Sequence, residues 1–248
     1  MVVPVVTPSA GRMDGEIDRA PVADGQVLGV VADQLQPLGR VQLGRQRYLV
    51  LAGNACILPA LGQLGREGEA AMLATTGGVN THRGALFALG ITVAAAMWLY
   101  AHEGHEVRKE RLQQMIQEIA AGFPPSADTH GAEVVAKARV KGARENAVEG
   151  YPDLFETWGP YYRKLREDPH RAHRTLLKIM SMLQDTNIYY RTDAETAEIV
   201  RQSSGQLLQR FSVNSLREAD AEFIRHNISP GGCADMLSLT ILINAILR

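Results

Sequence analysis

The 248-residue sequence is poor in cysteine and carries no excess of charge of either sign. Its two cysteines, Cys56 and Cys233, form no metal-type pair and are too few for a disulfide framework. We therefore expect a reduced, cytoplasmic setting. The 26 lysine and arginine residues balance the 27 aspartate and glutamate residues, so the chain lacks the basic field that holds nucleic acid. We expect no nucleic-acid partner.

We expect neither a signal peptide nor a membrane-spanning segment. The first residues have no basic start, and prolines interrupt their apolar stretch. The longest apolar stretch, residues 85–101, has 17 residues with Gly90 and Thr92 inside it. A membrane span needs ~20 residues. We interpret this stretch as a buried core helix and expect no membrane partner.

The pattern divides the chain into two parts. Residues 1–57 are rich in valine, glycine and glutamine and show no helical period, so they form short strands or an irregular segment. From residue 58 onward, apolar residues recur at helical spacing. Runs of helices without alternating strands predict an all-α fold. We expect a compact multi-helix single domain over 58–248, preceded by a divergent, irregular N-terminal segment over 1–57. The predicted helices span 58–74, 83–101, 105–121, 131–140, 153–166, 170–184, 193–211, 214–226 (with Asn214 as cap) and 230–247.

Four polar stretches at helix ends are not explained by packing. The first, residues 74–90, lies between two apolar helices. Its glycines permit close backbone approach, and a helix start rich in free N–H groups is a potential anion site. An interhelical turn with Asn and Thr caps is the simpler interpretation, and the missing Gly-Lys-Ser/Thr ending excludes a Walker loop. The stretch contains Thr75, Thr76, Gly77, Gly78, Asn80, Thr81, His82, Arg83 and Gly84.

The second and third stretches are charged. Residues 129–152 form either a solvated charged face or a cradle for polyphosphate. In residues 182–191, Asp185 and Asn187 directly follow an apolar helix. They form either a terminal cap or turn, or a site whose carboxylate points into a cleft and holds Mg²⁺. The charged and glycine positions of the second stretch are His130, Gly131, Lys137, Lys141, Gly142, Arg144 and Glu145.

The fourth stretch, residues 225–236, combines a helix start with two glycines. Ser229 is the expected cap and Pro230 the first helical residue. Gly231 and Gly232 follow, although each costs roughly 1 kcal/mol in a helix relative to alanine. Asp235 shares a face with Gly231, and a carboxylate on a largely apolar helix needs a partner. The helix dipole accounts for Asp235 but not for the glycines, which would let a phosphate or a neighbouring backbone come close.

These segments carry a resemblance to a known family. The segments "ATTGGVNTHRGALFALG", "GARENAVEGYP", "DTN" and "RHNISPGGCADML" occur in the order and at the spacing found in the triphosphoribosyl-dephospho-CoA synthase family, the CitG type, which includes malonate decarboxylase relatives. The resemblance covers residues 58–247. It implies an all-helical transferase that joins ATP to 3′-dephospho-CoA and releases adenine. The product is the precursor of the prosthetic group of the acyl carrier protein of citrate lyase or malonate decarboxylase, so the implied partners include the downstream apo-acyl carrier protein transferase system.

The resemblance also implies roles for individual residues. Helix starts at 77–84 and 230–232 supply N–H donors to phosphate, and Arg83 and Arg144 add charge-assisted bonds. Mg²⁺ on the phosphates is held by Asp185 and Asp235, or one of these two acts as base. His82 is the other candidate for proton transfer. The implied catalytic residues are Asp235, His82 and Asp185, and the implied substrate or phosphate ligands are Gly77, Gly78, Asn80, Thr81, Arg83, Gly84, Arg144, Asn187, Arg191, Asn227, Ser229, Gly231 and Gly232.

The sequence departs from the family pattern in two places. Residues 1–57 contain no Pro-Lys-Pro-Gly-Leu-Val segment and no following group of Asn, Gly, His and Asp, and no lysine precedes Lys109. Thr192 and Asp193 replace the glycines that follow Arg191 in many members. The first departure supports an alternative, a catalytically impaired relative that binds nucleotide or CoA as a regulatory or assembly protein. A plain helical interaction protein is the third reading, and it leaves the glycine-rich polar stretches unexplained.

Overall fold

The computed structural model describes residues 57–104, 106–124 and 140–247, and within these ranges it contains helices and no strand. The all-α prediction is confirmed. Cys56, His130, Lys137 and almost all of segments 1–57 and 131–140 lie outside the described residues, and the division at residue 57 stays a prediction. The elements are α2 (Ile57–Thr75), α3 (Arg83–His102), α4 (Lys109–Gly122), α6 (Ala143–Val148), η2 (Leu154–Trp158), α7 (Gly159–Lys164), α8 (Arg171–Met180), α9 (Thr186–Arg191), α10 (Ala194–Gln209), α11 (Val213–Arg225) and α12 (Gly231–Ile246).

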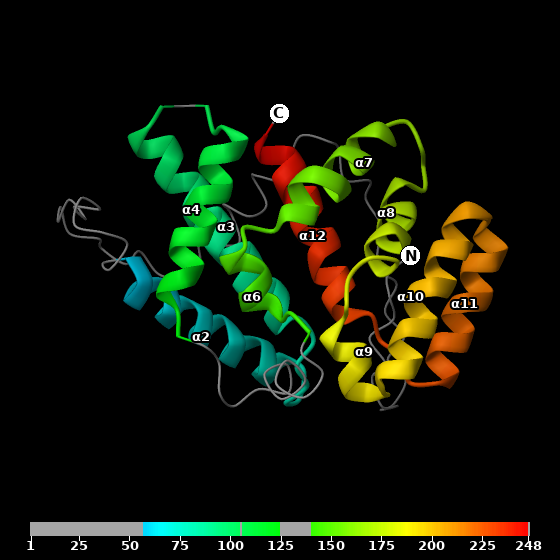
Figure 1. Cartoon of the computed structure of the whole chain (residues 1–248). Helices are drawn as coiled ribbons and strands as arrows, with labels where there is room; N and C mark the ends of the chain where they lie inside the picture. The colour runs from blue at the N-terminus through cyan, green and yellow to red at the C-terminus, as the bar shows by residue number, and fades with distance from the viewer. Residues whose placement is uncertain (1–56, 105, 125–139, 248) are drawn as a thin grey trace, which may run out of the picture. The chain divides into compact units, whose positions relative to one another are not determined.

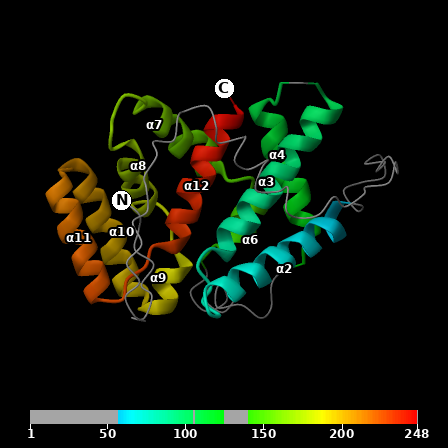
Figure 2. The ribbon, with the colours of Figure 1, turned by 180° about the vertical axis from the view of Figure 1, so that it is seen from behind.

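Two helices that are apolar around most of their circumference, α3 and α12, lie at the centre. Such a helix is stable in water only where other helices cover it. Figures 1 and 2 show α12 between α3 on one side and α8 on the other. On the α3 side, α2, α4 and α6 pack against α3, whereas α10 covers α8 and the amphipathic α11 lies outermost. The N-terminal ends of α3 and α12 therefore meet inside the bundle.

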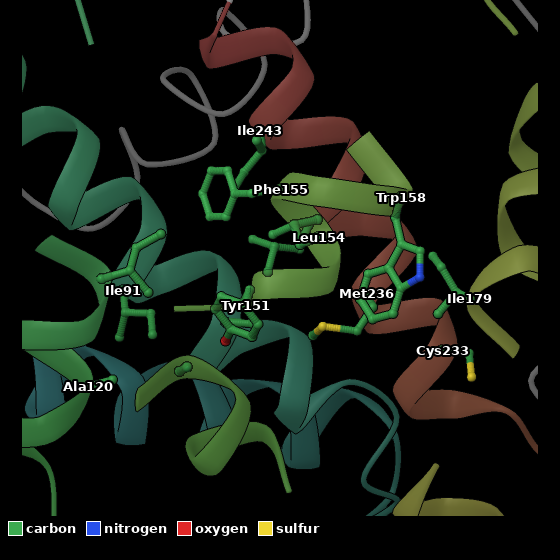
Figure 3. Packing of buried hydrophobic residues seen from close by; sticks show 14 of the residues in the cluster. Ile91, Ala120, Tyr151, Leu154, Phe155, Trp158, Ile179, Cys233, Met236 and Ile243 are labelled. Carbon is green, nitrogen blue, oxygen red and sulfur yellow. The ribbon is translucent and has the colours of Figure 1, made fainter. Parts of the chain in front are cut away.

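The hydrophobic core fills the space between these central helices. Ile91 of α3, Leu154 of η2, Ile179 of α8 and Leu239 of α12 are almost fully buried and belong to one cluster. Figure 3 shows Trp158 between Met236 and Ile179. Residues from four separate elements thus share one core, which holds α12 in a defined position relative to α3.

Two predicted helices are shorter than the sequence pattern suggested. The single helix predicted over 153–166 is a π-helical turn, η2, followed by α7. A Cβ at Gly159 would lie 2.9 Å from the carbonyl oxygen of Leu154, so glycine fits the wide turn. The helix predicted over 170–184 ends at Met180, which leaves residues 181–184 for the turn that leads to Asp185.

Two predicted caps are wrong. Ser212, rather than Asn214, caps α11, because its hydroxyl accepts the N–H of Ser215 at 3.1 Å. Ser229 does not cap α12: Pro230 occupies the N-cap position, and no side chain at that position makes a cap hydrogen bond. A side chain from elsewhere in the chain has to satisfy the first N–H groups of α12.

Among the described helices, α3 is long and apolar enough to cross a membrane by length and composition, with a mean hydropathy of 1.8. In the structure it contacts α2, α4, α6 and α12. It buries Ala88, Ile91, Ala95 and Leu99, as predicted for a core helix.

The central position of α12 predicts the effect of truncating its core side chains. We expect Leu239→Ala to lower the free energy of unfolding by about 2–5 kcal/mol, because a fully buried leucine leaves a cavity behind. Urea denaturation monitored by circular dichroism measures this. Leu64→Ala is the matched control, since Leu64 on α2 is 50% exposed and should change stability by less than about 0.5 kcal/mol. Equal losses in the two variants would contradict the core assignment.

Candidate active site

One small cavity, with a volume of about 70 Å³, gathers residues from three separate parts of the chain. They come from the loop before α3 together with its first turn, from helix α9, and from the segment that enters α12 together with the first turns of that helix. All of them belong to the set predicted from the sequence. The lining residues are Asn80, Thr81, His82, Arg83, Gly84, Asn187, Arg191, Ser229, Gly231 and Asp235.

Two helix N-termini open into this cavity. Arg83 and Gly84 are the first residues of α3, and Gly231 is the first residue of α12. The first-turn N–H groups of a helix lack intrahelical acceptors, and the helix dipole places partial positive charge at that end. The guanidinium of Arg191 adds a full positive charge to the lining. An arrangement of this kind binds anions such as phosphate.

Asp185 connects α9 to α12 by capping both helices. Its carboxylate Oδ1 accepts the N–H of Asn187 in its own helix at 2.9 Å. Its Oδ2 accepts the N–H of Cys233 in the first turn of α12 at 2.8 Å. Asp185 is 3% exposed. Its buried carboxylate provides the cap of α12 that was expected from Ser229.

Asp235 makes the corresponding connection from α12 to α3. Its carboxylate accepts the backbone N–H of Ala85 in the first turn of α3. The carboxylate occupies the place where a Cβ of Gly84 would stand. A side chain at position 84 would therefore displace Asp235, and glycine at the start of α3 is a requirement of this contact.

The two glycines at the start of α12 have the same explanation. A Cβ at Gly232 would lie 3.0 Å from Oδ1 of Asp185, and one at Gly231 would lie 2.9 Å from Nδ2 of Asn187. Both distances are shorter than ordinary van der Waals contact. The glycines of "SPGGCAD" therefore let α9 approach the N-terminus of α12, which offsets their cost in helix propensity.

Burial raises the pKa of both carboxyl groups, and the charge of Asp185 acts on Asp235 as well. Burial, together with the negative charge of Asp185, raises the pKa of Asp235 to about 7, although the Ala85 N–H opposes the shift. Burial also raises the pKa of Asp185, against the N–H groups of Cys233, Asn187 and Gly232. Asp235 is the carboxyl group that reaches the cavity, and a pKa near neutrality suits a proton acceptor.

The loop before α3 is held by its own polar groups. Gly77 and Gly78 have φ of 66° and 86°, which glycine adopts readily. Oδ1 of Asn80 accepts the N–H of Arg83 at 3.0 Å. The two glycines therefore shape the turn that delivers Asn80 to the cavity; they do not line it themselves.

Three other lining residues are already engaged with neighbours. His82 Nδ1 and the hydroxyl of Thr81 lie 2.6 Å apart. Arg83 Nε lies 3.0 Å from Oε1 of Glu69 on α2. Arg83 remains on the cavity wall and is 46% exposed. An incoming phosphate would have to compete with Glu69 for its guanidinium.

The structure does not bring every predicted residue into the lining. Arg144 lies on α6, and its Nε donates to the carbonyl oxygen of Phe123 at 2.8 Å. Asn227, with φ of 55°, accepts from Arg191 Nη1 at 3.1 Å and so supports a lining residue from behind. Asp185 and Gly232 lie beneath the cavity wall, in contact with one another. Of the second polar stretch, Lys141 pairs with Glu149 at 2.6 Å, both largely exposed.

The described residues contain no group of three or more His, Cys, Asp and Glu side chains that could hold a metal ion. Both oxygens of Asp185 already accept backbone N–H groups. The two carboxylates therefore do not present an open pair, and Mg²⁺ at Asp185 and Asp235 stays a prediction.

Sequence reasoning missed Tyr151, which lies close to this site. Its side chain is 2% exposed, its hydroxyl has no hydrogen-bond partner among the described residues, and its φ is 50°. Burial and the charge of Asp235 raise the pKa of Tyr151. The "GYP" sequence around it indicated only a turn. The available signal was a large aromatic residue in the turn between Gly150 and Pro152. Bulky residues rarely adopt a positive φ, so a tyrosine is unusual at such a position.

Comparison with known proteins adds an independent finding. A family model described as CitG: ATP:dephospho-CoA triphosphoribosyl transferase matches residues 40–248. A probable 2-(5''-triphosphoribosyl)-3'-dephosphocoenzyme-A synthase of Pseudomonas fluorescens is 38% identical over 198 residues, covering 75% of this chain and 67% of the relative. A probable synthase of the same name from Azotobacter vinelandii is 38% identical over 202 residues, with the same coverage. The synthase of that name from Klebsiella pneumoniae is 33% identical over 196 residues, covering 75% of this chain and 70% of the relative. No solved structure matches the chain.

The close approach of Asp185 to α12 predicts the effect of adding one methyl group. We expect Gly232→Ala to lower the free energy of unfolding by about 1–3 kcal/mol, because Asp185 must move away from the N–H of Cys233 and leave a buried polar group unpaired. Thermal unfolding measures the change.

Gly90→Ala on α3 is the matched control. Its Cβ would meet nothing within 4 Å, so the substitution should stabilise the helix by about 0.5–1 kcal/mol. If both variants shift stability in the same direction by the same amount, the capping role of Asp185 is wrong.

Proposed function

Since the chain belongs to the ATP:dephospho-CoA triphosphoribosyl transferase family, we propose that it transfers the triphosphoribosyl group of ATP to 3′-dephospho-CoA and releases adenine. The observation that carries this proposal is the cavity formed by the N-termini of α3 and α12, with Asp235 between them. The product would serve the acyl carrier protein of citrate lyase or malonate decarboxylase, and we place the reaction in the cytoplasm.

The proposed reaction exchanges one bond for another at the anomeric carbon of ATP. A ribose hydroxyl of dephospho-CoA forms a C–O bond there, and the bond from the same carbon to adenine breaks. Adenine departs with the electron pair of that bond and takes up a proton, while the hydroxyl proton passes to a base on the protein. Positive charge develops on the ribose in the transition state, as in glycoside cleavage.

The polar groups of the cavity fit the triphosphate end of ATP. The partial positive charge at the N-termini of α3 and α12 favours an anion there, and Arg191 supplies a charge-assisted donor. Arg83 does the same once it exchanges its contact with Glu69 for phosphate. The two helix N-termini are fixed before the substrate arrives, which limits the reorganisation needed in the transition state.

Asp235 is our candidate for the base that accepts the hydroxyl proton. It is the one carboxyl group in the cavity lining, and its pKa of about 7 allows it to accept a proton near neutral pH. Asp185 acts as a positioning residue: it holds the first turn of α12, and its charge contributes to the raised pKa of Asp235. His82, an exposed residue of the same cavity lining, is the candidate that protonates departing adenine.

Adenine release from ATP plus 3′-dephospho-CoA by the purified protein is the direct test of the proposed function. Separation of adenine from the nucleotides by chromatography measures it. Thermal stabilisation by ATP without adenine release would instead favour the alternative, a relative that binds nucleotide without turnover.

Replacing the proposed base should cause a defined loss of catalytic activity. We expect Asp235→Asn to lower kcat by about 10²- to 10⁴-fold, the usual contribution of a general base, with much smaller changes in KM. Asp220→Asn on α11 is the control, because it removes a carboxylate from an element with no buried residue. Full activity of Asp235→Asn would remove Asp235 from the chemistry.

The raised pKa predicts how activity depends on pH. A base must be deprotonated to work, so kcat/KM should rise tenfold per pH unit below about 7 and level off above it. Initial rates of adenine release between pH 5 and 9 measure the profile. A rate that is already constant from pH 5 upward would show that an ordinary carboxylate, or no carboxylate, controls the reaction.

A further inference from the structure

A second and larger cavity, with a volume of about 350 Å³, lies beside the first and was not anticipated from the sequence. Its size falls within the range of small-molecule sites. Its apolar wall is made by two aromatic side chains and three aliphatic or thioether side chains: Tyr151, Trp158, Met182, Leu183 and Met236. Figure 3 shows the Met236 sulfur between Tyr151 and Trp158. A wall of this composition favours a flat, largely apolar group.

The polar rim of this cavity does not suit phosphate. Lys141 pairs with Glu149 at 2.6 Å, and Arg201 binds both carboxylate oxygens of Glu198 at 2.7 and 2.6 Å. Each cation of the lining is therefore neutralised by a neighbour. Phosphate favours positive charge that is not paired with a carboxylate, and Arg191 provides it in the first cavity.

Amide groups remain available at the rim. Gln184 is exposed, lies in the turn between α8 and α9, and makes no side-chain hydrogen bond within the described part of the chain. A glutamine or asparagine amide pairs with the amino group and ring nitrogen of adenine through two hydrogen bonds. Asn146, whose Nδ2 donates to the carbonyl oxygen of Gly142 at 2.9 Å, keeps its amide oxygen on the same rim.

Consecutive residues of α12 line the two cavities. Asp235 lines the first cavity and Met236 lines the second. Tyr151 lines the second cavity and is close enough to Asp235 for its charge to raise the pKa of the phenol. A planar ring in the second cavity would therefore contact the residue of α12 that follows the proposed base, so a ribose joined to that ring can extend toward Asp235.

We infer that the cavity lined by Tyr151, Trp158, Met236 and Gln184 binds an adenine ring during the reaction. The inference rests on the proposed function, because both substrates of that reaction carry adenine. The aromatic and thioether wall stacks against the ring, and Gln184 reads its polar edge. The ring belongs either to ATP, whose adenine leaves, or to 3′-dephospho-CoA. The source of the ring determines which of the two substrates the cavity selects.

Two substitutions test the inference. Gln184→Ala removes the free amide from an exposed turn, and Leu183→Trp places a bulky ring in the cavity from a half-buried position. Calorimetric titration with free adenine measures binding without turnover. We expect Gln184→Ala to weaken adenine binding by about tenfold, the effect of a lost hydrogen bond, and Leu183→Trp to weaken it more. Gln206→Ala, on the exposed face of α10, is the matched control and should bind adenine as the unsubstituted protein does.

Steady-state kinetics of the same variants identify the source of the ring. A raised KM for ATP alone assigns the cavity to the leaving adenine, and a raised KM for 3′-dephospho-CoA alone assigns it to the acceptor; either result supports the inference. Adenine affinity and both KM values unchanged in Gln184→Ala and Leu183→Trp would overturn it. If the unsubstituted protein releases no adenine, the proposed function fails, and the calorimetric titration still decides whether this cavity binds the ring.

Discussion

One buried carboxylate, Asp185, and one half-buried carboxylate, Asp235, each cap a neighbouring helix and hold the candidate site together. Asp185, at the start of α9, accepts an N–H from the first turn of α12, and Asp235 of α12 accepts an N–H from the first turn of α3. The three helix starts are thus tied in series. Each link requires the partner backbone to come close, which Gly84, Gly231 and Gly232 permit. Three of the four polar stretches that resisted a packing explanation, 74–90, 182–191 and 225–236, supply the components of this series.

The same arrangement makes ionisation of the two carboxyl groups less favourable, and a catalytic reaction can use this change in acidity. Burial of two carboxyl groups near each other disfavours their charged forms and raises both pKa values. Asp185 is compensated by three backbone N–H groups, whereas Asp235 has the N–H of Ala85 and faces the cavity. The less compensated carboxylate is therefore the one available to a substrate. Sites that combine helix starts with a carboxyl group of altered pKa are typical of enzymes.

Much of the fold could be predicted from the sequence, because apolar periodicity marks α2, α3, α10 and α12 almost to their ends. All ten residues that line the first cavity came from motif positions. Motifs do not report orientation, and so Arg144 was grouped with the phosphate ligands although it bonds to Phe123. The Ser229 cap was wrong because local sequence rules cannot see Asp185, 48 residues before Cys233. The second cavity was missed for the same reason, since its wall combines residues from separate helices that share no spacing in the chain.

The acidity of Asp235 tests the account most directly, because it depends on the burial of this carboxyl group and on the neighbouring charge of Asp185. Titration of the Asp235 carboxyl carbon by NMR, assigned with Asp235→Asn, should give a pKa near 7. The Asp185→Asn variant should lower that value, since it removes the neighbouring charge. An ordinary pKa near 3.8 for Asp235, unaffected by the loss of Asp185, would contradict the proposed convergence of the two carboxylates.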